Sequence, residues 1–275
     1  MNRLGIAGVL LLTSCVCSFA GIDWQAKKSD EWLGHTRHYF DIEGVECWVV
    51  EPKSPKPGNP WIWCTEWPTA FTDRTGTPMF LADGYYFLYA KVGYMCLGGD
   101  VSLQKMDAFY RFFTAKGLRN KGVFTGVSRG GLYAFRFAWQ HPERVTCLYG
   151  DHAVLDFKSW PLHIGDRKYN PKDTGSLQAV KQMYGLQTME EILSYPHNPI
   201  DILPKIAEAK IPIVLVIGDA DIEVPPEFNS NIVEYRYRKL GGEVKTFRYP
   251  KYQHHPHGVD NPRELVDLIE SWDQR

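Results

Sequence analysis

The stretch KGVFTGVSRGGLYAFRFAWQ, residues 121–140, decides the fold. Its β-branched and aromatic residues over 123–125 predict a strand, and the segment rich in Ala, Phe and Leu after Gly131 predicts a helix. Between them, residues 126–130 fit the pattern G-x-S-x-G, in which Ser128 occupies a sharp strand-to-helix turn. Such a turn lifts the hydroxyl clear of the sheet, beside the positive end of a helix. Because short glycine-rich patterns also occur in ordinary turns, the serine needs partners elsewhere in the chain.

The composition is that of a soluble globular protein. A length of 275 residues suits a single α/β domain, and 44% hydrophobic and 23% charged residues are ordinary proportions. The formal net charge of −1 gives no basic excess. We therefore expect neither nucleic acid nor an anionic membrane surface as a partner.

Residues 1–20 have the features of a secretory signal peptide. Arg3 is the positive residue, residues 4–12 are apolar but too short to span a bilayer, and residues 18–20 offer a cleavage site before the domain at 21–275. The alternative is a lipoprotein signal ending at Cys15, which would tether the protein to a membrane. Both interpretations predict an exported, periplasmic or extracellular protein.

Four cysteines lie beyond this segment, at positions whose spacing matches no metal motif: Cys47, Cys64, Cys96 and Cys147. Export permits disulfides among them, and four buried thiols are the alternative.

Apolar strand segments alternate with amphipathic helical segments along the chain. Strands are expected at 36–42, 45–50, 61–64, 85–92, 123–125, 145–150, 211–217 and 244–249, and helices at 71–83, around 106–113, after Ser128, from 225 to 240 and from 262 to 272. This order predicts an α/β fold with a mostly parallel sheet of about eight strands, covered by helices on both faces. Residues 23–34 are expected to be a loose lead. Residues 151–199 are expected to be an insertion, with helices at 176–184 and 189–193, and not a separate large lid domain.

A serine hydroxyl becomes a good nucleophile when a histidine takes its proton and a carboxylate orients that histidine. In a parallel sheet these partners should lie in loops after the carboxyl ends of later strands. Asp219 and Asp221 follow the strand that ends at Ile217. The loop after the last strand contains three histidines, His254, His255 and His257. The order Ser, Asp, His at successive strand ends predicts a serine hydrolase.

With these residues in place, the chain resembles the α/β-hydrolase fold family from about Thr36 to Trp272. The family's acid commonly stands in a G-x-x-D-x-x-V-P arrangement, which residues 218–225 match. The resemblance therefore implies Asp221 as the acid in preference to Asp219. Asp156, just beyond the preceding strand, is a weaker candidate.

The resemblance leaves the choice of histidine open. The family's histidine usually follows a glycine, but Gln253 precedes His254 here, so His254 is the first choice and His255 and His257 remain alternatives. A metal site built from the three histidines is disfavoured because Pro256 prevents the helical spacing that ligand pairs often use. We expect no metal and no other cofactor.

The same resemblance places the oxyanion hole. One donor would be the amide after the nucleophile, that of Arg129, and the other would come from Thr65, Glu66 or Trp67. Glucuronoyl esterases also have an arginine directly after the serine, a similarity that is confined to this turn. Arg129 would then strengthen the oxyanion hole or bind a uronic acid. A structural ion pair with Glu66 or Asp156 is an equal alternative.

These features predict a secreted esterase that works through an acyl-enzyme: Ser128 attacks, His254 transfers the proton and Asp221 steadies the histidine. Export and the side chains expected at the mouth (Arg129, Glu66, Trp67, Asp156 and Trp160) indicate acetyl or methyl-uronate esters on a polysaccharide or oligosaccharide. A prolyl-oligopeptidase-type peptidase is less expected, because those enzymes carry a large N-terminal propeller and only about thirty-five residues precede the first predicted strand. A non-catalytic binding module on the same fold is the other alternative.

Overall fold

The structure, a computed structural model, describes residues 21–93, 95–165, 170 and 172–275. The predicted signal segment, with Cys15, lies outside these residues. No helix within the described ranges is long and apolar enough to cross a membrane.

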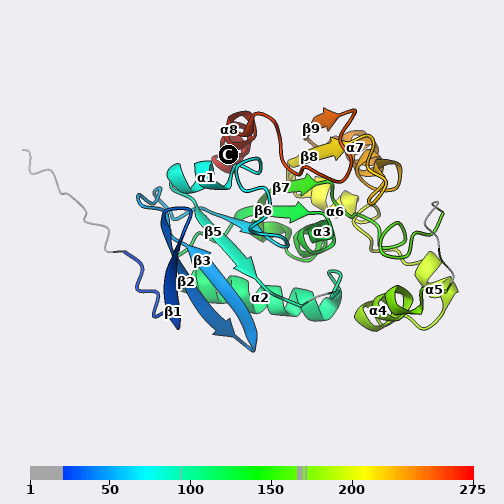
Figure 1. Ribbon diagram of the computed structural model, residues 1–275, viewed down its shortest axis with the longest axis horizontal. Helices are drawn as coiled ribbons and strands as arrows, with labels where there is room; N and C mark the ends of the chain where they lie inside the picture. The colour runs from blue at the N-terminus through cyan, green and yellow to red at the C-terminus, as the bar shows by residue number, and fades with distance from the viewer. Residues whose placement is uncertain (1–20, 94, 166–169, 171) are drawn as a thin grey trace, which may run out of the picture.

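One nine-stranded sheet runs through the described part of the chain, in the order β1-β2-β3-β5-β4-β6-β7-β8-β9 (Figure 1). β1 (Lys28–Trp32), β2 (His35–Ile42), β3 (Val45–Val50) and β5 (Tyr86–Ala90) pair antiparallel. From β5 onward all pairs are parallel, through β4 (Trp61–Cys64), β6 (Gly122–Val127), β7 (Val145–Asp151), β8 (Ile213–Gly218) and β9 (Val244–Tyr249). The predicted, mostly parallel α/β sheet is confirmed.

Helices cover both faces of this sheet (Figure 1). One core lies under α2 (Asp100–Ala115), α3 (Gly130–Gln140), α6 (Leu203–Glu208) and α7 (Ser230–Lys239). The other lies under α1 (Thr77–Ala82) and α8 (Pro262–Asp273). Side chains of β6 alternate between the two, since Val123 and Val127 enter the second core and Phe124 the first. Two short 3₁₀ turns, η1 (Pro142–Arg144) and η2 (Pro226–Phe228), precede β7 and α7.

The structure corrects several expected elements. Residues 28–32 form an edge strand, β1, where a loose lead was expected. Its exposed, polar side chains hide the strand from a pattern of apolar residues. α1 is shorter than the predicted helix, because Phe71 and Gly76 both have positive φ (51° and 77°) and interrupt it. α7 ends at Lys239, within the helix predicted from 225 to 240, and Leu240 just beyond it is exposed.

The insertion after β7 contains the two expected helices, α4 (Thr174–Tyr184) and α5 (Met189–Leu193), which lie beyond the carboxyl ends of the parallel strands in Figure 1. Tyr184 packs against Phe157 and Tyr195, with ring centroids 4.7 and 5.1 Å away. The guanidinium of Arg136, buried in α3, lies 4.9 Å from the centroid of the Tyr184 ring. Aromatic and cation–π contacts therefore hold the insertion to the helix that follows Ser128.

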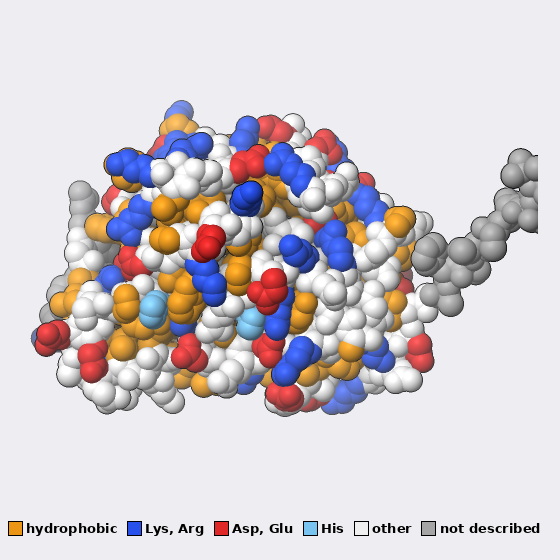
Figure 2. Space-filling view, turned by 180° about the vertical axis from the view of Figure 1, so that it is seen from behind, with side chains coloured by type: hydrophobic (Ala, Val, Ile, Leu, Met, Phe, Trp, Pro, Cys, Tyr) orange, Lys and Arg blue, Asp and Glu red, His pale blue; other side chains and the backbone are white. Residues whose placement is uncertain are grey.

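Charged residues of both signs are mixed on the surface. Figure 2 shows Lys and Arg side chains standing among Asp and Glu across one face of the molecule. This mixture agrees with the formal net charge of −1. The expected absence of nucleic-acid partners stays a prediction.

Candidate active site

Ser128 stands at the turn between β6 and α3, as the sequence pattern predicts. Its φ is 51°, a left-handed conformation that non-glycine residues adopt only under constraint. The turn is tight, because a Cβ on Gly126 would lie 2.7 Å from the Cα of Gly131. The Ser128 amide donates to the Asp151 carbonyl (2.9 Å), and the Ser128 carbonyl accepts from Val154 (2.8 Å). Both bonds fix the strained residue to the end of β7 and the segment after it.

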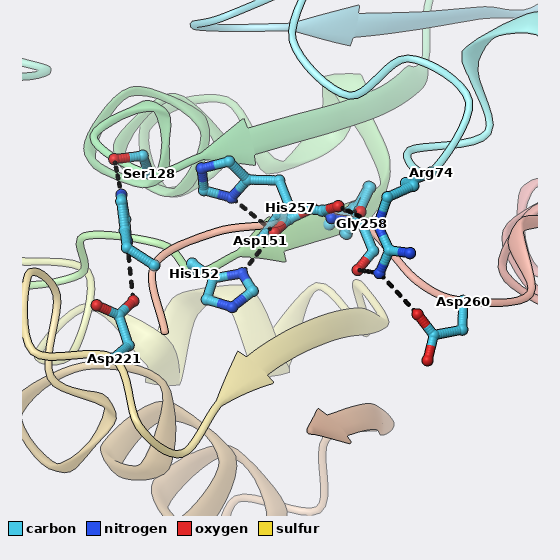
Figure 3. A network of polar contacts seen from close by, with 10 residues as sticks. Arg74, Ser128, Asp151, His152, Asp221, His257, Gly258 and Asp260 are labelled. Atoms are coloured by element: carbon cyan, nitrogen blue, oxygen red, sulfur yellow. Dashed lines mark hydrogen bonds and ion pairs between the residues drawn. The ribbon is translucent and has the colours of Figure 1, made fainter. Parts of the chain in front are cut away.

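Three side chains from separate strand ends form one hydrogen-bonded relay. Ser128 Oγ lies 2.9 Å from His254 Nε2, and His254 Nδ1 lies 2.8 Å from Asp221 Oδ2. Figure 3 shows the Ser128 hydroxyl and the Asp221 carboxylate at opposite ends of this relay. With Nδ1–H donated to the carboxylate, Nε2 is left to accept the serine proton.

The loop after β8 positions Asp221. Its Oδ1 accepts the amides of Glu223 and Val224, both at 2.9 Å, which leaves Oδ2 for the histidine. The carboxylate is buried, at 4% exposure. Asp219, the alternative acid, is instead paired with Arg248 at the surface.

The other two histidines of the loop face different partners. His255 is exposed and stacks on Phe71, with ring centroids 5.6 Å apart. Partial desolvation lowers the pKa of His255, and the neighbouring histidines lower it further. His257 is buried, and its Nδ1 lies 3.0 Å from Asp151 Oδ1. Of the three candidates, His254 is the one placed against the Ser128 hydroxyl.

The loop after β4 supplies the candidates for the second oxyanion donor. Thr65 does not fit this role, because its amide donates to the Thr125 carbonyl (2.9 Å) and its hydroxyl bonds the Thr125 and Gly130 carbonyls. Thr65 therefore ties the loop to β6 and α3. The Glu66 amide lies close to the turn, 3.4 Å from where a Cβ on Gly130 would stand. The amides of Glu66 and Trp67 remain the candidates for a second donor beside the amide of Arg129.

The Arg129 side chain forms the ion pair that the sequence left as one of two alternatives. Its Nη2 lies 3.0 Å from Glu66 Oε2, and both side chains are more than nine-tenths buried. Burial raises the pKa of the Glu66 carboxyl, and the nearby Arg129 charge opposes that rise. The guanidinium also lies 4.6 Å from the ring centroid of Trp67, whose side chain is 44% exposed. Trp67 thus offers an open aromatic surface beside the serine turn.

Asp156 and Trp160, expected at the mouth, have structural contacts. Asp156 is buried and accepts the Lys158 amide at 2.8 Å, while the Lys158 Nζ lies 3.6 Å from its other oxygen. Burial raises the pKa of the Asp156 carboxyl. Trp160 is partly buried and packs against the core that lies under α2, α3, α6 and α7. Among the described residues, no hydrogen bond joins either side chain to Ser128 or His254.

Sequence reasoning missed a second polar cluster, centred on Asp151. Its Oδ1 bonds His152 Nδ1 (2.8 Å) and His257 Nδ1 (3.0 Å), and its Oδ2 accepts the Tyr149 hydroxyl (2.6 Å) and the Gly258 amide (2.7 Å). Burial acts to raise the pKa of Asp151, but the bonds from the histidines outweigh it and hold the pKa well below its usual range. The available signal was an Asp-His pair directly after a buried strand.

Asp151, His152 and His257 also have the side-chain chemistry of a metal site, with potential ligand atoms within 4.8 Å of one another. Both oxygens of Asp151 already accept hydrogen bonds, however, and each histidine donates through the nitrogen nearest the carboxylate. Those bonds satisfy both Asp151 oxygens and the Nδ1 of each histidine, and they leave His152 Nε2 buried without a partner among the described residues.

Comparison with solved structures identifies the class of fold. No protein-family model matches the sequence, and no curated protein matches it. Est1E from Butyrivibrio proteoclasticus superposes with a TM-score of 0.58 at 15% identity, covering 86% of this chain and 97% of that one. Porphyromonas gingivalis dipeptidyl peptidase 4 superposes with a TM-score of 0.62 at 14% identity, covering 88% of this chain and 36% of that one. For Pyrococcus horikoshii acylaminoacyl peptidase the TM-score is 0.59 at 15% identity, and the superposition covers 84% of this chain and 38% of that one.

The protein has the α/β-hydrolase fold. Identities of 14% and 15% show a shared fold and not a shared substrate. The chain spans little more than a third of the two peptidases, which are longer chains.

Proposed function

We propose that the protein is a serine hydrolase that cleaves carboxylic esters through an acyl-enzyme. One observation carries the proposal: the Ser128 hydroxyl, the His254 imidazole and the Asp221 carboxylate are joined in series by bonds of 2.9 and 2.8 Å. Hydrogen-bonded nucleophile, base and orienting acid are the arrangement that acyl transfer requires.

Each group has one role in this chemistry. Ser128 Oγ attacks the ester carbonyl as His254 Nε2 accepts its proton, and Asp221 stabilises the resulting imidazolium. The amide of Arg129, with that of Glu66 or Trp67, stabilises the oxyanion. His254 returns the proton to the departing alcohol. Water, activated by the same histidine, then releases the acid and restores the serine hydroxyl.

The surroundings of the serine favour a neutral ester on a carbohydrate. Glu66 already balances the charge of Arg129, so an anionic substrate group would compete with an existing buried ion pair. An acetyl ester and a methyl-esterified uronate are both neutral. The exposed ring of Trp67 provides a flat surface on which a sugar ring can stack. Together with the proposed export signal, this supports an extracellular polysaccharide or oligosaccharide ester as the substrate.

The first test is covalent labelling of Ser128 with a fluorophosphonate. We expect labelling of the wild type, none in Ser128→Ala, and a rate lower by roughly 10³-fold or more in His254→Ala. His255→Ala is the matched control, since this neighbouring histidine faces Phe71, and it should label normally. A folded wild type that does not label would identify a non-catalytic module and overturn the proposal.

The second test addresses the substrate. Acetate release from acetylated xylan and methanol release from methylated pectin are measured beside hydrolysis of a simple aryl acetate. Release from either polymer, lost in Ser128→Ala, is the expected result. Cleavage of the aryl ester alone would overturn the carbohydrate assignment while leaving the esterase in place.

A serine peptidase is the second candidate, because solved structures that share the fold include dipeptidyl peptidase 4 and acylaminoacyl peptidase. A panel of peptide–aminomethylcoumarin substrates separates the two functions. Esterase activity predicts faster turnover of esters than of any peptide in the panel. Efficient peptide cleavage with slow ester turnover would replace the ester proposal by the peptidase one.

A further inference from the structure

Asp151 lies between the nucleophile and the segment that carries the base. It ends β7, directly beside Val127 in the ladder with β6. Its backbone carbonyl accepts the amide of Ser128 at 2.9 Å. Any movement of this residue therefore moves the serine turn with it.

While its backbone bonds the serine turn, the side chain of Asp151 bonds the loop that carries His254, residues 250–259, which we call the base loop. It accepts His257 Nδ1 at 3.0 Å and the Gly258 amide at 2.7 Å, three and four residues beyond His254. The Tyr149 hydroxyl and His152 Nδ1 hold the same carboxylate from its own strand end. All of these side chains are buried, so water does not offer replacement partners.

Arg74 braces the outer side of the same loop. Its Nε donates to the His257 carbonyl at 2.9 Å, its Nη2 pairs with Asp260 at 2.9 Å, and its own carbonyl accepts the Val259 amide at 3.0 Å. Figure 3 shows Asp151 and Arg74 on either side of the segment at Gly258. Asp151 thus holds the base loop to the sheet, and Arg74 holds it to the loop after β4.

We propose that Asp151 is a positioning residue for the reaction: it fixes the serine turn and the base loop in one geometry, so that His254 stays against Ser128. The inference rests on the proposed serine hydrolase function. Asp151 touches neither the serine hydroxyl nor His254 in the described contacts, and it acts through Gly258, His257 and the Ser128 amide. A misplacement of reacting groups by about 1 Å can lower a rate roughly 100-fold, so this restraint has a measurable effect.

The restraint depends on the hydrogen bonds that the Asp151 carboxylate accepts. Two substitutions distinguish the effect of these bonds from the effect of its negative charge. In Asp151→Asn the amide oxygen can accept from Tyr149 and Gly258, while the amide NH₂ donates to the two imidazoles after each changes tautomer. Asp151→Asn therefore keeps the tie to the loop and removes the charge. Asp151→Ala removes both.

A matched control is available at the other end of β7. Asp273 is also a buried carboxylate, and it accepts the Tyr85 hydroxyl (2.8 Å), an Arg119 nitrogen (2.6 Å) and the Thr146 hydroxyl (2.6 Å). Thr146 stands near the start of β7, whereas Asp151 ends it. Asp273→Ala should lower the melting temperature without moving the base loop.

The experiment compares the full-length wild type, Asp151→Ala, Asp151→Asn and Asp273→Ala. Hydrogen–deuterium exchange of peptides covering 250–259 is measured together with kcat, KM and the pH profile of kcat. We expect faster exchange in Asp151→Ala, a kcat lower by roughly 100-fold with KM within about threefold, and an altered acid limb. Asp151→Asn should stay within about fivefold of wild-type kcat. Asp273→Ala should match the wild type in the exchange of 250–259 and in kcat.

Three results would overturn the proposal: unchanged exchange and kcat in folded Asp151→Ala, an Asp151→Asn variant as slow as Asp151→Ala, or a metal ion in the purified protein that is lost in Asp151→Asn. Exchange does not depend on activity. A wild type that hydrolyses nothing would therefore refute the serine hydrolase function, while the exchange data still report whether Asp151 holds the loop.

Discussion

Gly218, at the end of β8, has no side chain because the base loop occupies the space beside it. A Cβ there would collide with the Tyr252 carbonyl oxygen and lie 2.7 Å from the Gln253 carbonyl oxygen and 2.8 Å from His152 Nε2. The two carbonyls immediately precede His254. The first glycine of the G-x-x-D arrangement thus has a steric cause in this fold.

Gly218→Ala should push the base loop away from Ser128. We expect kcat/KM for an aryl acetate to fall by roughly 10- to 100-fold, because the histidine is displaced from its nucleophile. Gly175→Ala is the control, since a Cβ in α4 would meet only Asp173 Oδ1 at 3.5 Å, and its activity should be unchanged. Equal activities in the two variants would contradict this account of Gly218.

Among individual residues, the sequence predicts those side chains that stand in recognisable patterns at strand ends. Ser128, Asp221 and His254 were selected in that way, and the structure joins them. Asp151 was missed because its role depends on lying beside β6 and on reaching a loop more than a hundred positions later. The direction of the Thr65 amide toward Thr125 is likewise set by strand pairing and not by residue type.

Among the elements, Asn229 connects the segment after β7 to the loop after β8. Its Oδ1 accepts the amides of Leu155 (2.8 Å) and Asp156 (3.2 Å), and its Nδ2 donates to the Pro225 carbonyl (2.9 Å). The side chain is fully buried. It therefore holds together two loops that flank the candidate site.

Asn229→Ala should leave these buried amides and the carbonyl without partners. We expect the free energy of unfolding to fall by about 2–4 kcal/mol, measured by urea denaturation. In Asn231→Ala, which removes one exposed bond to Arg248, the fall should stay within about 1 kcal/mol. Similar losses in both variants would mean that Asn229 does not join the two loops.

Elements with buried, alternating or amphipathic patterns were predicted well, and β3, β4 and α5 have the expected bounds. Those without an apolar stripe were not. β1 is polar and exposed at the sheet edge, and α1 begins only after Gly76, where the backbone leaves the left-handed region. Exposed strand pairing and local dihedral angles leave little trace in residue composition.

For the molecule as a whole, the state of the cysteines is testable. The four cysteines that the structure describes are free thiols; Cys47, Cys64 and Cys147 are buried and Cys96 is half-buried. Burial raises the pKa of Cys47 to about 12 and also raises those of the other three. A raised thiol pKa means less thiolate at pH 8, and the thiolate is the reactive form.

Alkylation of the native protein at pH 8, followed by peptide mapping, should modify Cys96 first. Cys47, Cys64 and Cys147 should react only after denaturation, and treatment with a reductant should not change the pattern. A disulfide between any two of the four would contradict the prediction and would favour the alternative that the export signal permits.

The connection between β7 and β8 has a consequence for how such a protein can change over time. These strands are hydrogen-bonded neighbours, yet the chain between them makes a long excursion that carries α4, α5 and α6. Because the excursion leaves and rejoins the ladder at adjacent positions, the part that carries α4 and α5 can change in length and composition while the pairing and the core under α6 stay intact. Natural variation can therefore remodel this stretch while the turn that carries Ser128 is inherited unaltered from one descendant to the next.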